Sequence, residues 1–314
     1  MYLELGIIVA ASMQMRKSNL SIYSALVANL LIAVIKFIAG TVSNSSAMIA
    51  EGIHSIVDTA NELLVLFGLH QSQRPADRKR PFGYGRELYF WSFIVSMLIF
   101  GLGGGISIYQ GIVHIINPEK LGDPFWNYIV LATSILFEGT SLLIAARAFN
   151  KIAGHHTWWQ TVKDSKDPSD FLVLFEDGAA VLGLLIVACC VWLGHRYQIN
   201  YLDGVASLLV GIILVAVSLV LARESRSLLM GEGIAIATRQ RIIAIVEADP
   251  STEKTITLFS IYMGADEILL IMDIQFKAEL KTPGIHHAID RLKEDIQKEY
   301  PRIKYVVIQP EFKS

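Results

Sequence analysis

Charged residues are scarce in this chain of 314 residues, and the shortage is uneven. They make up 18% of the sequence against 53% hydrophobic residues, whereas soluble globular proteins carry about 25% charged residues. The shortage is concentrated before residue 223, and the remainder has the composition of a soluble domain. A formal net charge of −2, without a block of basic residues between aromatics, does not suggest a nucleic-acid surface. The composition therefore indicates a membrane protein with a water-soluble C-terminal part and no nucleic-acid partner.

Several chemical motifs are also missing. Only two cysteines occur, Cys189 and Cys190. Because adjacent cysteines are poorly placed to bond to each other, we interpret them as apolar packing residues. The phosphate-binding pattern GxxxxGK[ST] is absent, which favours an ion gradient over ATP as an energy source. No segment contains HExxH, which counts against an intramembrane metal-dependent hydrolase.

Six segments are long and apolar enough to cross a bilayer, which takes about 20 mostly apolar residues. They cover roughly residues 20–41, 45–70, 87–115, 125–149, 171–194 and 200–222. The second and fourth connecting loops are basic, whereas the other three carry only Lys120 and Arg196. Short cytoplasmic loops are enriched in Lys and Arg, so both termini should be cytoplasmic. Residues 1–19 are predicted to form an interfacial segment, and the lack of an Arg-rich leader favours a bacterial plasma (inner) membrane.

Residues 223–314 follow a different pattern. Helices are predicted over 235–247 and 283–300, and strands over 256–264, 267–280 and 304–310. In the second strand the apolar residues alternate, so that one face carries Ile268, Leu270, Met272 and Ile274. The order of elements predicts a small α+β domain outside the membrane, with helices covering one face of its sheet.

Acidic residues in two of the spans mark the candidate site. An ionised Asp at the centre of a membrane helix costs roughly 2.5 to 3.5 kcal/mol, so such residues need a partner or a function. His54 and Asp58 are four residues apart, on one face of a helix, and Glu176 and Asp177 lie in the fifth span. Imidazole and carboxylate groups are good Zn²⁺ ligands. The alternative is a buried hydrogen-bonded pair that fixes helix packing.

These features resemble the cation diffusion facilitator family of proton-coupled zinc transporters, and within it the zinc transporter nine-like branch. The residues that carry the resemblance are SNSSAMIAEGIHSIVDTANELLVLFGL in the second span, the following RPADRKRPFGYGRE, and FEDGAAVLGLLI in the fifth span. The resemblance implies six transmembrane helices followed by a cytoplasmic α+β domain of the metallochaperone or ferredoxin-like type. It also implies a homodimer held together by that domain.

The resemblance further implies a transport site with two ligands on the second span and two on the fifth. Matched residue by residue, these are His54, Asp58 and Asp177, while the fourth position falls on Val173, which cannot bind a metal. Glu176 is the available substitute, although neighbouring helical residues point about 100° apart. The site then has either three protein ligands plus water or four ligands in an unusual shape. A loop metal site of some members would need Asp77 and two His, but Arg80 and Tyr84 stand in their place, so we expect it to be absent.

The expected function is export of Zn²⁺ from the cytoplasm in exchange for protons, without a resident cofactor and without enzymatic activity. The carboxylate-rich ligand set makes Mn²⁺ or Fe²⁺ a possible substrate as well, and Co²⁺ and Cd²⁺ are further alternatives. A non-transporting membrane metal sensor or scaffold is the alternative from a different functional class.

Overall fold

The computed structural model describes residues 29–118, 125–154, 157–158, 161–162 and 169–311. The expected interfacial segment 1–19 and the start of the first span lie outside the described residues. The chain divides into two compact units. The first comprises residues up to 65 together with 94–152 and 170–221, and the second comprises 66–93, 153–169 and 222–314.

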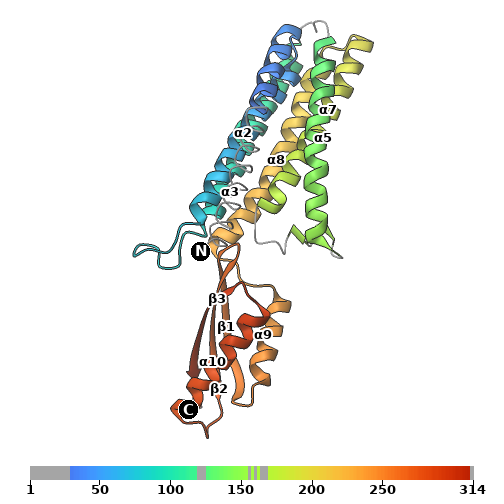
Figure 1. The fold of residues 1–314 in the computed structure, drawn as a ribbon. Coiled ribbons are helices and arrows are strands. Elements are labelled where there is room, and N and C mark those ends of the chain that lie inside the picture. Colours follow the sequence, from blue (N-terminus) through green and yellow to red (C-terminus); the bar gives the residue numbers. More distant parts are fainter. Residues whose placement is uncertain (1–28, 119–124, 155–156, 159–160, 163–168, 312–314) are drawn as a thin grey trace, which may run out of the picture. The chain divides into compact units, whose positions relative to one another are not determined.

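The first unit is built from long helices that run roughly along a common direction (Figure 1). A helix covers Asn29–Ser43. After it come α2 (Ser46–Ser72), α3 (Glu87–Leu98), the π-helical segment η1 (Ile99–Gly105), α4 (Ile106–Ile116), α5 (Phe125–Ala153), α7 (Ser169–Tyr197) and α8 (Tyr201–Met230). α3, η1 and α4 form one continuous span.

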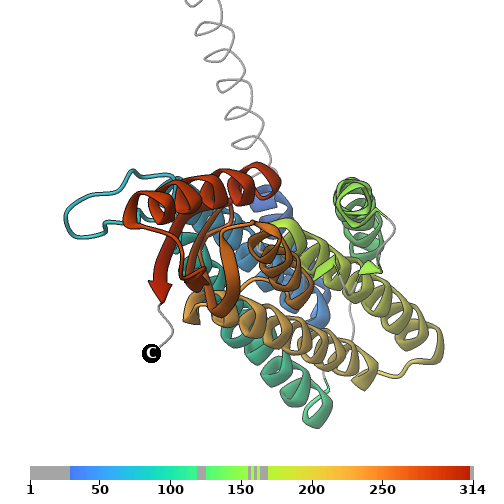
Figure 2. The ribbon, with the colours of Figure 1, turned by 90° about the horizontal axis from the view of Figure 1, so that it is seen from below.

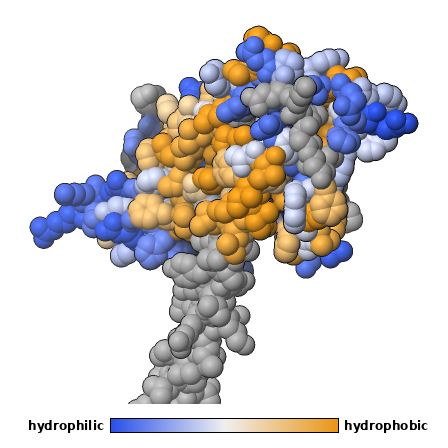
Figure 3. Space-filling model, turned by 90° about the horizontal axis from the view of Figure 1, so that it is seen from above, coloured by the Kyte–Doolittle hydropathy of each residue, from blue (hydrophilic) through white to orange (hydrophobic). Residues whose placement is uncertain are grey.

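Four of these helices are long and apolar enough to cross a membrane: Glu87–Ile116, Phe125–Lys151, Phe171–Tyr197 and Tyr201–Met230. Asn29–Ser43 is apolar but shorter in its described part, and α2 is a continuous helix whose apolar sequence contains the polar residues of the candidate site. With these two, the helices correspond to the six expected spans. Large apolar side chains such as Ile38 (57% exposed), Leu136 (68%) and Ile144 (63%) point outward, and Figure 3 shows broad hydrophobic areas on the face drawn there. Such a surface suits lipid.

A residue from α8 fixes the beginning of α2. The carboxylate of Asp203 is 1% exposed. It accepts hydrogen bonds from Ser45 Oγ (2.5 Å), Ser46 Oγ (2.8 Å) and the backbone N–H of Ala47 (3.1 Å). The first N–H groups of a helix have no partner within the helix, and a negative charge there also interacts favourably with the helix dipole. Asp203 therefore acts as a cap supplied from another helix.

Glycines allow α4 and α8 to approach backbone to backbone. A Cβ atom added at Gly111 would lie 2.6 Å from the backbone N of Leu208 and 2.8 Å from the carbonyl O of Gly204. In return, a Cβ atom at Gly204 would lie 2.9 Å from the carbonyl O of Gly111. Small residues that permit such close approach are typical of membrane helix interfaces.

We expect Gly111→Ala to destabilise the protein by roughly 1 to 3 kcal/mol, because the added methyl group meets backbone atoms that cannot move aside. The matched control is Gly101→Ala, since an added Cβ at Gly101 has no described atom within 4 Å. Thermal unfolding in detergent should show a lower midpoint for Gly111→Ala and an unchanged or higher midpoint for Gly101→Ala. Equal midpoints for the two variants would contradict this interpretation of the interface.

The second unit contains a three-stranded sheet in the order β1 (Thr252–Gly264), β2 (Glu267–Phe276) and β3 (Ile303–Glu311). β1 pairs antiparallel and β3 parallel with β2, and the helices are α9 (Ile236–Ala248) and α10 (Thr282–Glu299). This confirms the α+β prediction. β2 ends at Phe276 and not at residue 280, because the chain turns there: Lys277 N–H donates to Ser251 O, and Leu280 N–H donates to Lys277 O.

One face of the sheet forms the core of this unit. Ile268, Leu270, Met272 and Ile274 are each 5% exposed or less, as the alternation predicted. They belong to one cluster with residues of α9 and α10, which lie side by side over this face (Figure 2). The opposite face is open and apolar: Phe259, Ile271 and Val307 pair across the three strands and are 65%, 38% and 50% exposed.

Candidate metal site

The polar residues of α2 recur every three or four positions and therefore share one face of the helix. The residues of this face that concern the candidate site are Glu51, His54, Ser55, Asp58 and Asn61. All are buried except Asp58, whose side chain is 18% exposed. A stripe of this kind can be accommodated within a membrane only if it faces other helices and not lipid.

His54 and Asp58 lie together but are not hydrogen-bonded. The distance from His54 Nε2 to Asp58 Oδ2 is 3.4 Å, and among the described residues neither ring nitrogen of His54 has a hydrogen-bond partner. Asp58 Oδ1 is also buried without a described partner. Buried polar atoms are usually paired, so these atoms fit a cation-binding role better than the alternative of a pair that fixes packing.

Glu176 and Asp177, the two acidic residues of the fifth span, interact with different helices. Glu176 is 8% exposed, its carboxyl group lies within hydrogen-bonding reach of Asp58, and it accepts a hydrogen bond of 2.6 Å from Asn61 Nδ2. Asp177 turns toward α5, where Ser141 Oγ donates a 2.7 Å hydrogen bond to its Oδ2. The cause is the step of about 100° between neighbouring helical residues. The structure thus brings Asp58 close to His54 and to Glu176, and it directs Asp177 to another helix.

Val173, at the position where the resemblance implies a fourth ligand, is 43% exposed and contributes no donor atom. Within the described part of the chain, no three His, Cys, Asp or Glu side chains are close enough together to hold a metal ion. A complete coordination shell would therefore require side chains of this group to move toward one another.

Three further charged residues form a neighbouring cluster, which the sequence did not place at the site. Lys36, fully buried on the first helix, is 3.2 Å from Glu51 Oε2 and 3.0 Å from Glu138 Oε1 of α5, measured from Nζ. Nζ also donates to Ser55 Oγ at 2.9 Å. A charge within a membrane span is itself a signal of function, and that signal was present for Lys36 and Glu51 as much as for Asp58.

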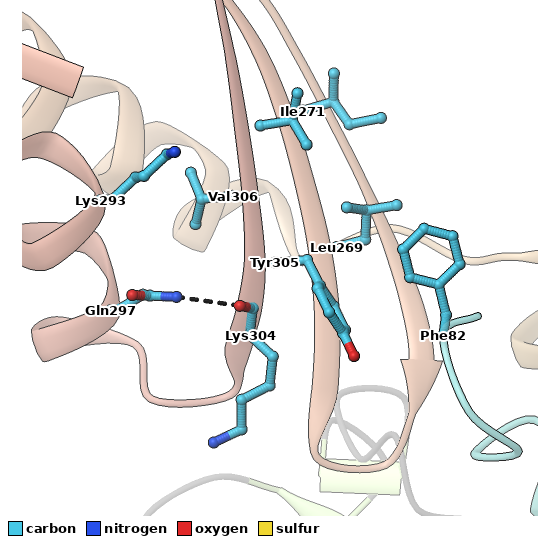
Figure 4. Close-up of a pocket in the computed structure, with 9 residues that line it drawn as sticks. Phe82, Leu269, Ile271, Lys293, Gln297, Lys304, Tyr305 and Val306 are labelled. Carbon is cyan, nitrogen blue, oxygen red and sulfur yellow. Dashed lines mark hydrogen bonds between the residues drawn. The ribbon is translucent and has the colours of Figure 1, made fainter. Parts of the chain in front are cut away.

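The second unit contains a pocket of about 470 Å³ along the edge strand β3. Phe82, Leu269, Ile271 and Tyr305 lie on one side of the strand and Lys293 and Gln297 on the other (Figure 4). Gln297 Nε2 donates to the carbonyl O of Lys304 at 3.1 Å, and Phe82 packs edge-on against Tyr305 with 5.4 Å between ring centres. The lining contains no His, Cys, Asp or Glu, so it does not compete with α2 as a metal site.

In the basic loop after α2, the acidic residue Asp77 is hydrogen-bonded to other residues of the same loop. Tyr84 Oη donates to Asp77 Oδ2 at 2.7 Å, and the backbone N–H groups of Arg80 and Lys79 donate to Oδ1 at 2.7 and 2.8 Å. These hydrogen bonds, chiefly that from Tyr84, lower the pKa of Asp77 below its usual value. Arg80 pairs with Glu87. Arg80 and Tyr84, which stand where a loop metal site would need His, thus organise the loop.

Comparison with known proteins identifies the family. Residues 22–230 match the family model described as the cation efflux transmembrane domain. The proton-coupled zinc antiporter SLC30A9, mitochondrial, is 34% identical over 251 residues in Xenopus laevis, covering 79% of this chain and 44% of that protein. The same protein of Homo sapiens is 31% identical over 267 residues, covering 84% and 47%. The chain thus spans about half the length of these relatives.

A solved structure of the MamM CTD in a nickel form covers 26% of this chain and 100% of that chain, with 21% sequence identity and a TM-score of 0.24. The relatives at 31–34% identity are named as mitochondrial proteins, so the comparisons do not support the expected bacterial inner membrane. The family model covers well over half of the sequence, and its boundaries enclose all the intramembrane charges described above. The chain belongs to the cation diffusion facilitator, or cation efflux, family.

Proposed function

We propose that this membrane protein is a secondary transporter that exports Zn²⁺ in exchange for protons. The observation that carries the proposal is the position of Asp58 of α2 close both to His54 of the same helix and to Glu176 of α7, with buried nitrogen and oxygen atoms of His54 and Asp58 that have no described hydrogen-bond partner. The printed name of the relatives, a proton-coupled zinc antiporter, agrees with this choice of substrate and exchange ion.

The proposed ligands are His54, Asp58, Glu176 and Asp177. Imidazole and carboxylate groups must be deprotonated to bind a metal, so a proton and Zn²⁺ compete for the same atoms. Competition at a single site is sufficient for antiport, provided that the site opens alternately to the two sides. Asn61, which donates to Glu176, would orient this carboxylate, as residues around metal ligands commonly do.

Three carboxylates beside one imidazole form a hard ligand set, which keeps Mn²⁺ and Fe²⁺ as alternative substrates. The proposal also includes both termini on the cytoplasmic side, as the basic second and fourth loops indicate. It further includes a homodimer, as the family resemblance implies. The mass of the detergent-solubilised protein, measured by light scattering, tests the dimer independently of transport.

The test of the proposed function is metal uptake into proteoliposomes with an acidic interior. Zn²⁺ uptake should require the pH gradient, disappear when nigericin collapses it, and disappear with Asp58→Ala protein reconstituted at equal density, while Mn²⁺ should enter more slowly. A folded wild-type protein that binds Zn²⁺ but shows no gradient-dependent flux would instead be a sensor or scaffold.

A further inference from the structure

Lys36 is a buried charge that the proposed transport mechanism does not use. Its side chain is fully buried, and lysine is almost never fully buried unless it is paired. Its ammonium group contacts two carboxylates and a hydroxyl group from two other helices: Glu51 and Ser55 of α2, and Glu138 of α5. Three membrane helices are therefore joined through one cation.

Glu138 is shared between this cation and the proposed metal site. Its Oε1 is bound to Lys36, while its Oε2 is buried and has no hydrogen-bond partner in the part of the chain that the structure describes. The carboxyl group is also close enough to Asp58 and Asp177 to interact with both electrostatically. It thus binds the ammonium group of Lys36 and also interacts with two of the proposed ligands.

Glu138 could supply a further ligand to the proposed metal site. Asp177, one of the four proposed ligands, accepts a hydrogen bond from Ser141 of α5 in the structure, and Val173, at the position where the resemblance implies the fourth ligand, is exposed and has no donor atom. A divalent cation among carboxylates attracts any further carboxylate within reach, and charges interact strongly where water is excluded. Lys36 would still retain Glu51 and Ser55 if Glu138 moved away.

We propose that Lys36 is a tethered cation that competes with the transported metal ion for Glu138. Metal binding releases Glu138 from Lys36 to the metal, and departure of the metal returns it. No covalent bond changes: one ion pair is exchanged for another. This inference rests on the proposed function, and it adds Glu138 to the ligands and Lys36 as a positioning residue that acts through Glu138.

A purely structural role for Lys36 makes a different prediction. If Lys36 only neutralised two buried acids, its loss would lower stability without a specific effect on metal affinity. If it acted on the metal only through long-range repulsion, its effect on affinity would not depend on Glu138. Of these explanations, only competition for Glu138 requires that the effects of Lys36 and Glu138 on metal affinity be coupled. A double-mutant cycle measures this coupling.

The experiment is equilibrium Zn²⁺ binding to full-length protein in nanodiscs at fixed pH, by competition with a zinc-chelating dye. Lys36→Met should tighten binding about tenfold, because it removes the competitor, and Glu138→Gln should weaken binding about tenfold. Lys36→Met added to Glu138→Gln should change affinity little. Glu62→Gln is the matched control: Glu62 is a carboxylate of α2 that hydrogen-bonds Asn29. In the Glu62→Gln protein, Lys36→Met should still tighten Zn²⁺ binding about tenfold.

The inference is overturned if Lys36→Met shifts the Zn²⁺ affinity equally with and without Glu138, or does not shift it at all. Thermal unfolding of each variant shows whether it is folded. If Lys36→Met does not fold, Glu138→Gln alone decides, since unchanged affinity in that variant excludes Glu138 as a ligand. Absence of Zn²⁺ binding by the wild type refutes the proposed function and this inference together. Binding that is lost in Asp58→Ala but uncoupled from Lys36 and Glu138 refutes this inference alone.

Discussion

Asp58→Asn should weaken Zn²⁺ binding at least about 100-fold while leaving the protein folded. Asparagine keeps the shape of the side chain but loses the negative charge that a divalent ion needs. The change also removes one of two carboxyl groups that meet at the Asp58–Glu176 contact, so the unfolding midpoint should stay constant or rise. Equilibrium metal binding and thermal unfolding of the same preparation measure both quantities.

Asp177→Asn provides the comparison for this prediction. Its carboxylate accepts a hydrogen bond from Ser141 of α5 in the structure. A loss of affinity as large as that of Asp58→Asn would favour a site with four protein ligands, and a loss of less than about tenfold would favour three protein ligands plus water. A folded Asp58→Asn protein with wild-type zinc affinity would remove Asp58 from the proposed site.

The largest loss of stability is expected for Asp203→Ala. This substitution removes the acceptor of three hydrogen bonds at the start of α2, one of them from a backbone N–H group. Hydrogen bonds to charged groups contribute about 1.5 to 3 kcal/mol each, but they are not additive, so we expect a destabilisation of roughly 3 kcal/mol. Thermal unfolding in detergent measures it, and zinc affinity should fall in parallel because α2 carries His54 and Asp58.

Asp203→Asn is the control, since an amide oxygen can still accept from Ser46 or Ala47. It should lose clearly less stability than Asp203→Ala. If the alanine variant unfolds at the wild-type temperature, the hydrogen bonds at this end of α2 do not limit stability, and another contact must fix the helix.

Much of the fold could be predicted from periodicity. The alternation in β2 placed Ile268, Leu270, Met272 and Ile274 on one face, and burial of that face follows directly from the side-chain geometry of a strand. The spans were recognisable because apolar runs of about 20 residues are rare outside membranes. The end of β2 was predicted too late, because Lys277 bonds back to Ser251 and this turn depends on a distant segment.

The candidate site was only partly predictable, for a physical reason. His54 and Asp58 share a helix face through local spacing alone, so the sequence was sufficient to pair them. Whether Glu176 or Asp177 faces α2 depends on the rotation of α7 about its axis, which packing against other helices determines. Lys36 and Glu138 are 102 residues apart, and no local pattern predicts which charges on different helices will meet.

The cap on α2 also bears on how the chain is made. Asp203 follows Ser45 by 158 residues and lies in the first turn of α8, so the ribosome must complete three further membrane helices and begin α8 before α2 receives the carboxylate that closes its first turn. A nascent chain released after α7 would contain His54, Asp58, Glu176 and Asp177 and still lack the residue that anchors the helix bearing two of them. Assembly of the proposed metal-binding group is in this sense a late event in the synthesis of this chain, because it depends on the insertion of α8.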